Sequence, residues 1–215
     1  MCVLKTPTVE WLGRVSYEQS LNLQKDLVEK VSSDGEEKLL ILEHEPVFTI
    51  GKKRDQSSLI DATNLPFPLY CINRGGQATY HGPGQLICYP IFNLAARGRD
   101  LHRYLRFLEA VLIVLLKEYG LSGNRREGFT GVWVENRKIA SIGIGVRQWI
   151  SMHGFACNVT EELAGFSAII PCGIKGVIMT SIAKETGLEI DIHEVAEVAR
   201  VAFLDLLENL PDGKF

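Results

Sequence analysis

The sequence predicts an α+β fold in which helices pack on a mixed, mostly antiparallel sheet. Two observations indicate this class. Amphipathic helical patterns stand near both ends of the chain and in its middle, and short apolar runs joined by tight turns fill the stretches between them. The 215 residues suffice for one large core, and no internal repeat, low-complexity tract or Pro/Ser-rich linker divides them. We therefore expect residues 1–215 to form a single domain.

The first predicted helix begins at Ser16. Ser16 and Gln19 have the spacing of a capping box, in which each side chain bonds a backbone N–H of the other residue. The apolar residues that follow form one face of a helix: Leu21, Leu23, Leu27, Val28 and Val31. After this helix, the runs KLLILEH (38–44) and VFTI (47–50) predict two strands.

A second helix is predicted in the middle of the chain, after two more strands. The runs LYCIN (69–73) and LICYPIFNL (86–94) are typical of strands and flank a glycine-rich segment. Asp100 then stands at the N-cap position of a helix that ends at Gly120. The leucines of this helix recur at helical spacing: Leu101, Leu105, Leu108, Leu112 and Leu115.

The second half of the chain predicts an antiparallel meander and a last helix. Three β-rich runs follow one another, the first two joined by a turn at Asn136-Arg137: GVWVE (131–135), KIASIGIGV (138–146) and WISMHGFACNV (149–159). Asp191 and Glu194 provide the start signal of the last helix. Its apolar face consists of five residues: Val195, Val198, Ala202, Leu206 and Leu207.

Composition and charge are those of an ordinary globular protein, with 46% hydrophobic and 23% charged residues. The formal net charge of −3 gives no bulk attraction to nucleic acid or to an anionic membrane. No apolar run approaches the roughly 20 residues that span a bilayer, and the first residues resemble neither a signal peptide nor a transit peptide. We expect a cytoplasmic protein that binds neither nucleic acid nor a membrane.

The cysteines predict neither a disulfide framework nor a metal site. They are odd in number and widely spaced, at positions 2, 71, 88, 157 and 172. The chain has no C-x-x-C motif and no pair of histidines at helical ligand spacing, so a zinc site is not expected. We expect no metal and no cofactor.

The segment RGGQATYHGPGQ (74–85) is the first candidate site. Its glycines and proline exclude an ordinary helix, and Pro83 excludes a plain strand because it lacks a ladder donor. No Gly-Lys-Ser/Thr follows, as in a P-loop, and no helix follows Gly84, as in a dinucleotide fingerprint. Two interpretations remain: a surface turn, or a wall where backbone approaches a ligand and Arg74, Tyr80 and His81 supply polar groups.

Cys172 is the candidate nucleophile. Pro171 and Gly173 place it in a tight segment where its sulfur can be exposed, whereas Cys71, Cys88 and Cys157 lie in strand-like apolar runs and are expected to be buried. The thiolate is the reactive form and needs an electropositive setting.

Sequence spacing does not decide which residue would act as the base for this thiol. Lys138 could favour the thiolate or take its proton if it faces Cys172, although a lysine after a hairpin turn is usually solvated. His153 is the base that a Cys/His hydrolase would use, although a histidine in such a run is more often a core residue.

Three blocks together resemble the lipoyl(octanoyl) transferase family, in the order and spacing of that family: RGGQATYHGPGQL, NRKIASIGIGVRQWISMHGFACNV and IIPCGI. The resemblance covers most of the chain. The first block differs from the more glycine-rich R-R-x-x-G-G-G-type segment of the related ATP-dependent lipoate ligases. Ala78 stands where a β-branched residue is expected.

The resemblance implies a fold like the catalytic domain of biotin and lipoate protein ligases. It also implies an acyltransferase that takes an octanoyl or lipoyl group from acyl carrier protein as a thioester on Cys172. The acceptors would be lysines in the lipoyl domains of 2-oxoacid dehydrogenases and in the glycine cleavage H protein, a step of protein lipoylation and lipoate biosynthesis. Lys138 matches the residue that favours the thiolate and shuttles protons.

The resemblance further implies a slot for the acyl chain with three walls. Glycine and alanine in these walls would let the chain lie against backbone. The walls are Arg74, Gly75, Gly76, Gln77, Ala78, Thr79, Tyr80 and His81; Ser141, Ile142 and Gly143; and Gly154, Phe155 and Ala156.

Two other functions stay open at this point. An ATP-dependent ligase of the same fold would need an adenylate site, whereas a non-catalytic acyl-carrier-binding module would need neither Cys172 nor Lys138.

Because the family's donor protein is acidic, we expect a basic rim around the slot, and we expect salt to slow the transfer by weakening association with the donor. The expected rim residues are Lys52, Lys53, Arg54, Arg74, Arg137 and Arg147.

Overall fold

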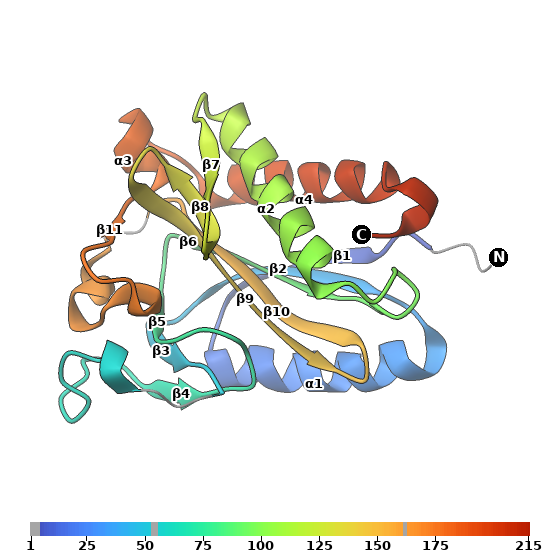
Figure 1. The fold of residues 1–215 in the computed structure, drawn as a ribbon, viewed down its shortest axis with the longest axis horizontal. Coiled ribbons are helices and arrows are strands. Elements are labelled where there is room, and N and C mark those ends of the chain that lie inside the picture. Colours follow the sequence, from blue (N-terminus) through green and yellow to red (C-terminus); the bar gives the residue numbers. More distant parts are fainter. Residues whose placement is uncertain (1–4, 53–55, 161–162) are drawn as a thin grey trace.

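A twisted sheet runs through the centre of the molecule (Figure 1). The computed structural model describes residues 5–52, 56–160 and 163–215, and eight strands within these ranges form the sheet. Its order is β1 (Thr8–Val15), β2 (Lys38–His44), β6 (Gln85–Ile91), β10 (Ile150–Asn158), β9 (Arg137–Arg147), β8 (Phe129–Val134) and β7 (Gly123–Arg126), with β11 (Ile178–Met179) paired to β9. The β1–β2 and β9–β11 pairs are parallel and the others antiparallel, so the predicted mixed sheet and α+β class are confirmed.

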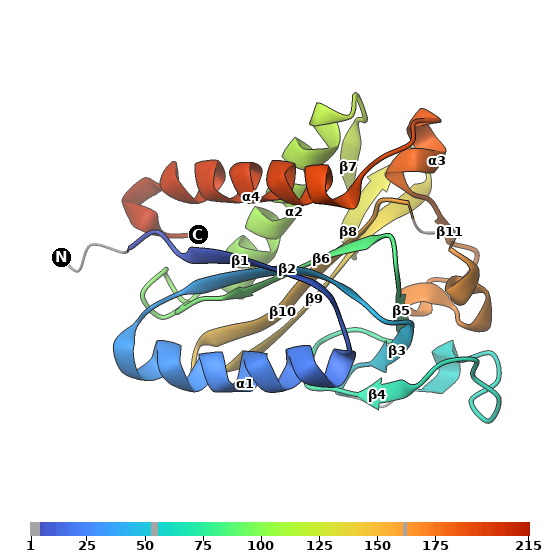
Figure 2. The same ribbon diagram turned by 180° about the vertical axis from the view of Figure 1, so that it is seen from behind.

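A smaller sheet packs beside one end of the large one, near the start of the first helix (Figures 1 and 2). It consists of β4 (Leu69–Cys71), β3 (Val47–Ile50) and β5 (Thr79–His81), in that order. β5 lies inside the glycine-rich segment, for which the sequence argued against a strand. That expectation is wrong for three residues, because Pro83 falls after β5 and removes no donor from its ladder with β3.

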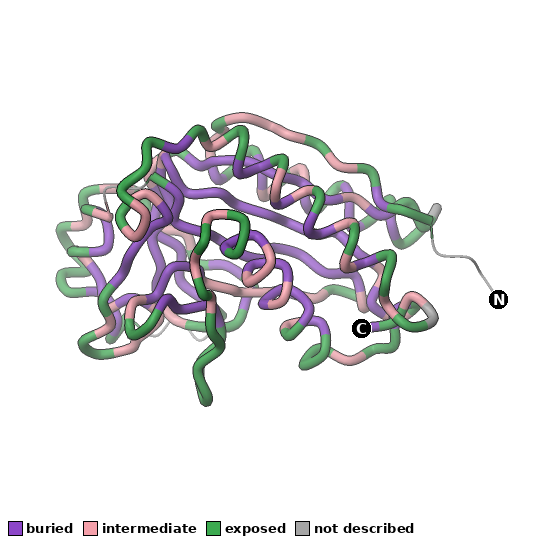
Figure 3. The backbone as a smooth tube through the Cα atoms, turned by 90° about the horizontal axis from the view of Figure 1, so that it is seen from above, coloured by how far each residue is buried: buried purple, intermediate pink, exposed green. Residues whose placement is uncertain are grey.

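Helices cover both faces of the large sheet. α1 (Tyr17–Asp34) packs on one face, and α2 (Leu101–Glu118) and α4 (Ile192–Glu208) pack on the other (Figure 2). Figure 3 shows the buried residues gathered along the strands and the inward sides of the helices. Two cores result, one on each face: Leu27, Val28 and Val31 face Leu40 and Ile87 under α1, and Leu108, Leu112, Leu115 and Phe203 face Leu39, Phe155 and Cys157 under α2 and α4.

The predicted helix starts are confirmed. Ser16 and Gln19 form the capping box of α1, and the Asp100 carboxylate accepts hydrogen bonds from the backbone N–H groups of His102 and Arg103. Asp191 caps α4 in the same way. α2 ends at Glu118, two residues before Gly120, which follows with a left-handed φ of 71°. No helix among the described residues is both long and apolar enough to cross a membrane.

Several elements were not predicted: β1, β7, β11, the short α3 (Ile182–Thr186) and the 3-10 turns, including Pro171–Gly173. β1 is half exposed along its length and lacks a clean apolar alternation, so its sequence carries no strand signal.

Cys71, expected to be buried, is exposed because β4 is an edge strand of the small sheet. Cys88 and Cys157 are buried as expected, and Cys2 lies outside the described residues.

Candidate active site

A cavity of about 370 Å³ lies between the large sheet and the small sheet. β9 and β10 form one side, and the glycine-rich segment and the Pro171–Gly173 turn form the other. Most residues of the three expected walls line it, together with both candidate catalytic residues: Arg74, Gly75, Gly76, Gln77, Thr79, His81, Ser141, Ile142, Gly143, Gly154, Phe155, Ala156, Lys138 and Cys172.

Ala78 and Tyr80 do not line this cavity. Successive residues of a strand face opposite sides, so Thr79 and His81 of β5 face the cavity while Tyr80 faces away. Tyr80 and Ala78 pack instead in an apolar cluster with Phe48 and Phe166. For these two residues the expected place in the wall is wrong.

The nitrogen Nζ of Lys138 lies 3.3 Å from the sulfur of Cys172. Ser141 Oγ, on the same side of β9, lies 3.8 Å from that sulfur. Lys138 is the second residue of β9 and is only 1% exposed, and its carbonyl accepts a hydrogen bond from Thr180 N–H where the chain leaves β11. The sequence left open whether Lys138 faces Cys172, and the fold brings them into contact.

The turn that carries Cys172 has a strained backbone. Cys172 has a φ of 54°, in the left-handed region that residues other than glycine rarely adopt. Its N–H donates to the Ala78 carbonyl at 2.9 Å, which ties the turn to the glycine-rich segment. Gly173, beside Cys172, has a φ of 69°, which side chains rarely adopt, and a Cβ there would displace the Gln77 side-chain amide.

The Lys138 side chain is enclosed by Trp133 and Gly131 of β8. Its Nζ lies 5.1 Å from the centre of the Trp133 ring, a cation–π distance, and a Cβ at Gly131 would lie 3.0 Å from Lys138 Cε. Among the described residues, no carboxylate forms an ion pair with Lys138. A thiolate at Cys172 is therefore the natural counter-ion of its ammonium form.

Arg74 shapes the cavity wall from inside. Its guanidinium is buried and donates hydrogen bonds to the carbonyls of Thr49, Gly75 and Gln77 and to the Thr49 hydroxyl, at 2.8 to 3.0 Å. Burial lowers the pKa of this guanidinium, and the nearby Cys172 opposes the shift. The Arg74 stem crosses Gly143, where a Cβ would lie 2.9 Å from Arg74 Cδ. Gly143 thus makes room for Arg74, in addition to any room it leaves for a ligand.

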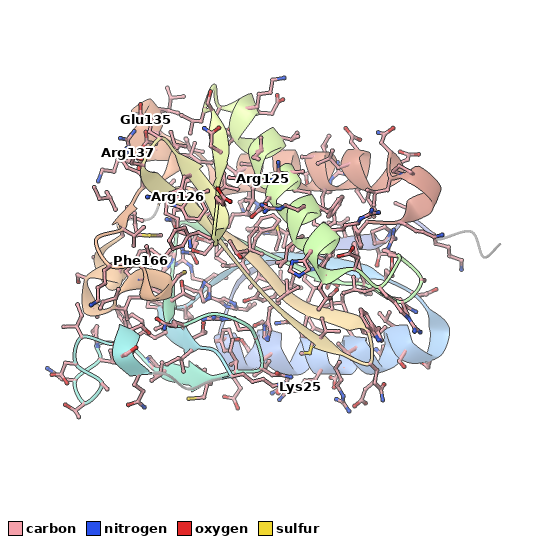
Figure 4. The ribbon with its side chains drawn as sticks, in the orientation of Figure 1. Lys25, Arg125, Arg126, Glu135, Arg137 and Phe166 are labelled. Atoms are coloured by element: carbon pink, nitrogen blue, oxygen red, sulfur yellow. The ribbon has the colours of Figure 1, made fainter. Side chains whose placement is uncertain are left out.

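Of the residues expected to form a basic rim, three in the described part of the chain are buried or paired with carboxylates. Arg74 is buried, Arg137 pairs with Glu185 and Glu135, and Arg147 lies 3.7 Å from Glu29 of α1. Figure 4 shows Arg137 and Glu135 close together at the β8–β9 turn. Lys52 is exposed, and Lys53 and Arg54 lie outside the described residues.

A chain of hydrogen bonds among buried polar side chains beside the cavity sets the tautomer of His81. The Thr180 carbonyl can only accept, so Asn158 Nδ2 donates to it and Asn158 Oδ1 accepts from Gln85 Nε2, both at 2.8 Å. Gln85 Oε1 then faces His81 Nδ1 at 2.7 Å, so Nδ1 carries the proton and Nε2 is left as an acceptor.

Three buried histidines, His44, His81 and His153, are neutral at neutral pH. Burial is the main cause: it lowers the pKa of His44 to about 4, and those of His81 and His153 to about 3. His44 Nδ1 donates to the Val15 carbonyl at 3.1 Å, so its Nε2 accepts from the Tyr89 hydroxyl at 2.9 Å. The Cys/His pairing considered from the sequence is not formed, because the sulfur of Cys172 contacts Lys138 and Ser141.

The sequence pointed to Cys172 and Lys138, which the structure brings into contact, but not to most of these buried polar residues. Tyr17, His44 and Tyr89 lie in apolar or helical runs, where a single polar side chain gives no pattern. Among these polar residues, the sequence pointed to only two: His81 as a wall residue and His153 as a possible base. Both line the cavity.

The fold and the cysteine–lysine pair define the class to which the chain belongs. The chain is a member of the lipoyl protein ligase A/B catalytic domain family, whose family model matches residues 16–204. Within that family its similar relatives are octanoyltransferases. It is 50% identical over 201 residues to the octanoyltransferase of Citrifermentans bemidjiense, covering 93% of this chain and 97% of the relative, and 47% identical over 203 residues to that of Geobacter sulfurreducens, covering 94% and 85%.

Solved structures show the same fold at much lower identity. A putative lipoate protein ligase from T. acidophilum superposes with a TM-score of 0.75 at 16% identity, covering 95% of this chain and 86% of that one. The biotin protein ligase of Aquifex aeolicus superposes with a TM-score of 0.56 at 16% identity, covering 95% and 70%. The expected likeness to the biotin and lipoate ligase domain is confirmed.

Proposed function

We propose that this octanoyltransferase works through a thioester on Cys172, with Lys138 as the group that moves protons. The chain is an acyltransferase that transfers an octanoyl group to lipoyl domains, the activity of its family. The observation that supports the proposed route is the 3.3 Å contact between Lys138 Nζ and Cys172 Sγ at the wall of the cavity.

In the first step the thiol of Cys172 becomes a thiolate by passing its proton to Lys138. The thiolate attacks the carbonyl carbon of the donor thioester, a C–S bond forms to Cys172, and the C–S bond to the donor breaks. The departing thiolate takes the proton back from Lys138. Exchange of one thioester for another is near neutral in free energy, so this step needs no ATP.

In the second step an acceptor lysine attacks the Cys172 thioester. Its amine must first lose a proton, and Lys138 is the nearest buried amine to the reacting sulfur. Acylation makes Cys172 a neutral thioester, so its sulfur no longer offers a counter-ion to an ammonium at Lys138. The C–N bond forms, the C–S bond to Cys172 breaks, and the departing sulfur takes the second proton of the attacking amine. Lys138 gives its proton to solvent, and the amide product makes the whole transfer downhill.

We propose octanoyl-acyl carrier protein as the donor. The proposed acceptors are the lipoyl domains of 2-oxoacid dehydrogenases and the glycine cleavage H protein. Family membership supports an acyl donor and a lipoyl-domain acceptor in general. The match to a relative over 93% of the chain supports treating residues 1–215 as one catalytic domain. The free thiols of Cys88, Cys157 and Cys172 fit a reducing cytoplasm as the place of action.

An ATP-dependent ligase is the second function that this fold serves. One solved neighbour is a lipoate-protein ligase A bound with ATP, but it shares only 16% identity with this chain, whereas relatives near 50% identity are octanoyltransferases. Identity at that level favours the transferase.

The test is the intact mass of the protein after mixing with octanoyl-acyl carrier protein in the absence of ATP. We expect a gain of one octanoyl group in the unmodified protein and none in Cys172→Ala. Pyrophosphate exchange with ATP, together with no adduct, would show a ligase instead. Transfer that persists in Cys172→Ala would exclude the thioester.

A further inference from the structure

The mouth of the cavity lies beside the hairpin of β7 and β8. The lining residues that are also exposed mark this mouth: Gly75, Gly76, Gly128, Phe129 and Thr130. Phe129 is 40% exposed although it is a large apolar side chain, and its ring lies 6.3 Å from that of Trp133, which packs against Lys138. A partner that reaches Cys172 through this mouth therefore passes Phe129.

Three arginines lie on this hairpin and on the neighbouring helix α2. Arg126 pairs with Phe129 across the hairpin, and its guanidinium lies 5.6 Å from the centre of the Phe129 ring. Arg125 of β7 and Arg106 of α2 both form ion pairs with the Glu109 carboxylate, at 2.9 and 2.7 Å. Figure 4 shows Arg125 and Arg126 on the hairpin next to α2. We call Arg106, Arg125, Arg126 and Phe129 the hairpin patch.

The Glu109 carboxylate holds two of these guanidiniums in place. Its side chain is 2% exposed, and it also accepts a hydrogen bond from Gly131 N–H of β8 at 3.4 Å. The side chains of Arg106 and Arg125 are 60% and 41% exposed, so N–H donors that Glu109 does not use face solvent. Two positive charges fixed on one buried negative charge leave a net positive surface that is already ordered for an anion.

Arg126 adds a charge that the described protein does not neutralise. No carboxylate among the described residues forms an ion pair with it. Glu127 at the hairpin tip is the acidic residue of the segment 123–134, and it is exposed. Arginine and aromatic side chains are enriched in protein interfaces, so an exposed cation over an exposed ring fits an anionic protein surface.

We propose that the hairpin patch is the docking surface for the acyl donor, an acidic carrier protein. The inference deepens the proposed function and rests on it. The guanidiniums would bind carboxylate or phosphate groups of the donor, and Phe129 would add an apolar contact at the point where the acyl chain enters.

The position of the patch favours the donor over the acceptor as its partner. The Glu109 carboxylate does not touch the sulfur of Cys172: Gly131 and Lys138 stand between them in the chain of contacts. An acceptor lysine reaches only about 6 Å from its Cα, so the acceptor must rest directly over the sulfur. A carrier protein holds its acyl group on a longer flexible arm, so its body can rest to one side.

The experiment compares two donors in single-turnover acylation of Cys172. One is octanoyl-acyl carrier protein, and the other is S-octanoyl-N-acetylcysteamine, a small neutral thioester without a protein surface. Arg126→Glu reverses a charge without breaking an ion pair with any described residue. At low salt it should lower the second-order rate constant with the carrier protein by about tenfold and leave the rate with the small thioester unchanged.

Two further readouts follow the sign of the charge. Added salt should narrow the difference between the unmodified protein and Arg126→Glu, because it screens exposed charges. Glu127→Gln removes a negative charge from the hairpin tip, so it should raise the rate with the carrier protein and leave the rate with the small thioester unchanged.

The matched control is Arg103→Glu, the same charge reversal on α2. Arg103 is 73% exposed and stands two residues from Leu105, which lines the cavity; two residues are about 200° of helix rotation, so Arg103 faces away from the mouth. Arg103→Glu should leave both rates unchanged. Equal losses from Arg103→Glu and Arg126→Glu with the carrier protein would show an effect of net charge and exclude a local docking surface.

The failures are distinguishable. If neither donor acylates Cys172 of the unmodified protein, the proposed function is wrong. If both donors acylate it but Arg126→Glu changes neither rate, or lowers both equally, the docking surface is wrong and the thioester route stands. If Arg126→Glu slows only the transfer from the acylated enzyme to a lipoyl domain, the patch binds the acceptor and its assignment to the donor is wrong.

Discussion

Lys138 Nζ and Cys172 Sγ lie 3.3 Å apart although 34 residues separate them in the chain. β9 supplies the lysine, and a strained turn tied to the Ala78 carbonyl supplies the cysteine. The pair is buried on the lysine side and open to the cavity on the sulfur side, with Trp133 behind the ammonium. This arrangement suits a nucleophile that must be both activated and reached by two protein substrates in turn.

We predict that octanoyl-acyl carrier protein labels Cys172 and no other cysteine. Burial raises the pKa of Cys157 to about 12 and that of Cys88 well above its usual value, so neither forms a thiolate at neutral pH. Cys71 is exposed but lies outside the residues that line the cavity. Peptide mapping of the acylated protein checks this, and an octanoyl group found on Cys71, Cys88 or Cys157 would refute it.

The helices and the meander could be predicted because their signals are local. Ser16 with Gln19, Asp100 and Asp191 each mark a helix start within four residues of sequence. The runs of β9 and β10 follow each other closely and pair as an antiparallel hairpin. β1 and β5 gave no such signal. β1 pairs in parallel with β2 across the whole of α1, and β5 is a three-residue strand between glycines that pairs with distant β3.

The site was predicted only in part for a similar reason. The resemblance of three blocks pointed to the cavity lining, but the alternation of β5, which turns Ala78 and Tyr80 away, depends on a strand that the glycines concealed. Arg74 was expected in the basic rim, but its guanidinium is buried. Four acceptor oxygens, from the backbone and from the Thr49 hydroxyl, satisfy it there. The contact of Lys138 with Cys172 follows from the packing of β9 against the turn, which no spacing in the sequence encodes.

We predict that the protein loses stability as the pH falls from about 6.5 toward 4. His44, His81 and His153 have folded-state pKa values of about 4, 3 and 3 against an ordinary 6.5, so below pH 6.5 the unfolded chain binds protons that the folded protein does not. The free energy of unfolding therefore rises with pH in this window and falls as acid is added, by up to about 1.4 kcal/mol per pH unit for each histidine.

Urea unfolding at pH 7, 6 and 5 measures this slope. His153→Gln removes one of the titrating groups, so its slope should be smaller by about one third. A free energy of unfolding that is flat between pH 6 and 5 would mean that the three histidines are not buried as neutral groups.

We predict a large loss of stability from Glu37→Ala, with the chemistry at Cys172 left intact. Glu37 and Arg97 form a buried ion pair in which Arg97 Nε and Nη2 donate to the carboxylate, and Asn93 N–H donates to it at 2.8 Å. Removing the carboxylate leaves the Arg97 guanidinium buried without its partner, which costs about 3–5 kcal/mol. Urea unfolding at neutral pH measures the change.

The matched control for that change is Arg103→Ala. Arg103 pairs with Asp100 at 3.6 Å, but its side chain is 73% exposed, so the loss should stay below about 1 kcal/mol. Equal losses from the two variants would show that Glu37 and Arg97 gain nothing from their burial. The rate of Cys172 acylation per folded molecule should be the same in both.

The last prediction separates a base from a fixed charge at Lys138. Arginine keeps the positive charge but does not give up its proton at working pH, whereas the two half-reactions require a group that accepts and returns one. Lys138→Arg should therefore be nearly as damaging as Lys138→Ala, with both lowering the single-turnover rates of acylation and deacylation by about 10²- to 10⁴-fold. Cys172→Ala gives the background rate, and circular dichroism checks that each variant is folded.

A packing control is needed because Trp133 lies 5.1 Å from the Lys138 nitrogen and would accommodate the larger guanidinium only with adjustment. Lys138→Met, which is of similar length and uncharged, provides this control. If Lys138→Arg transfers octanoyl at close to the unmodified rate while Lys138→Met does not, the lysine acts as a charge that stabilises the thiolate, and the proton must leave the acceptor amine by another route.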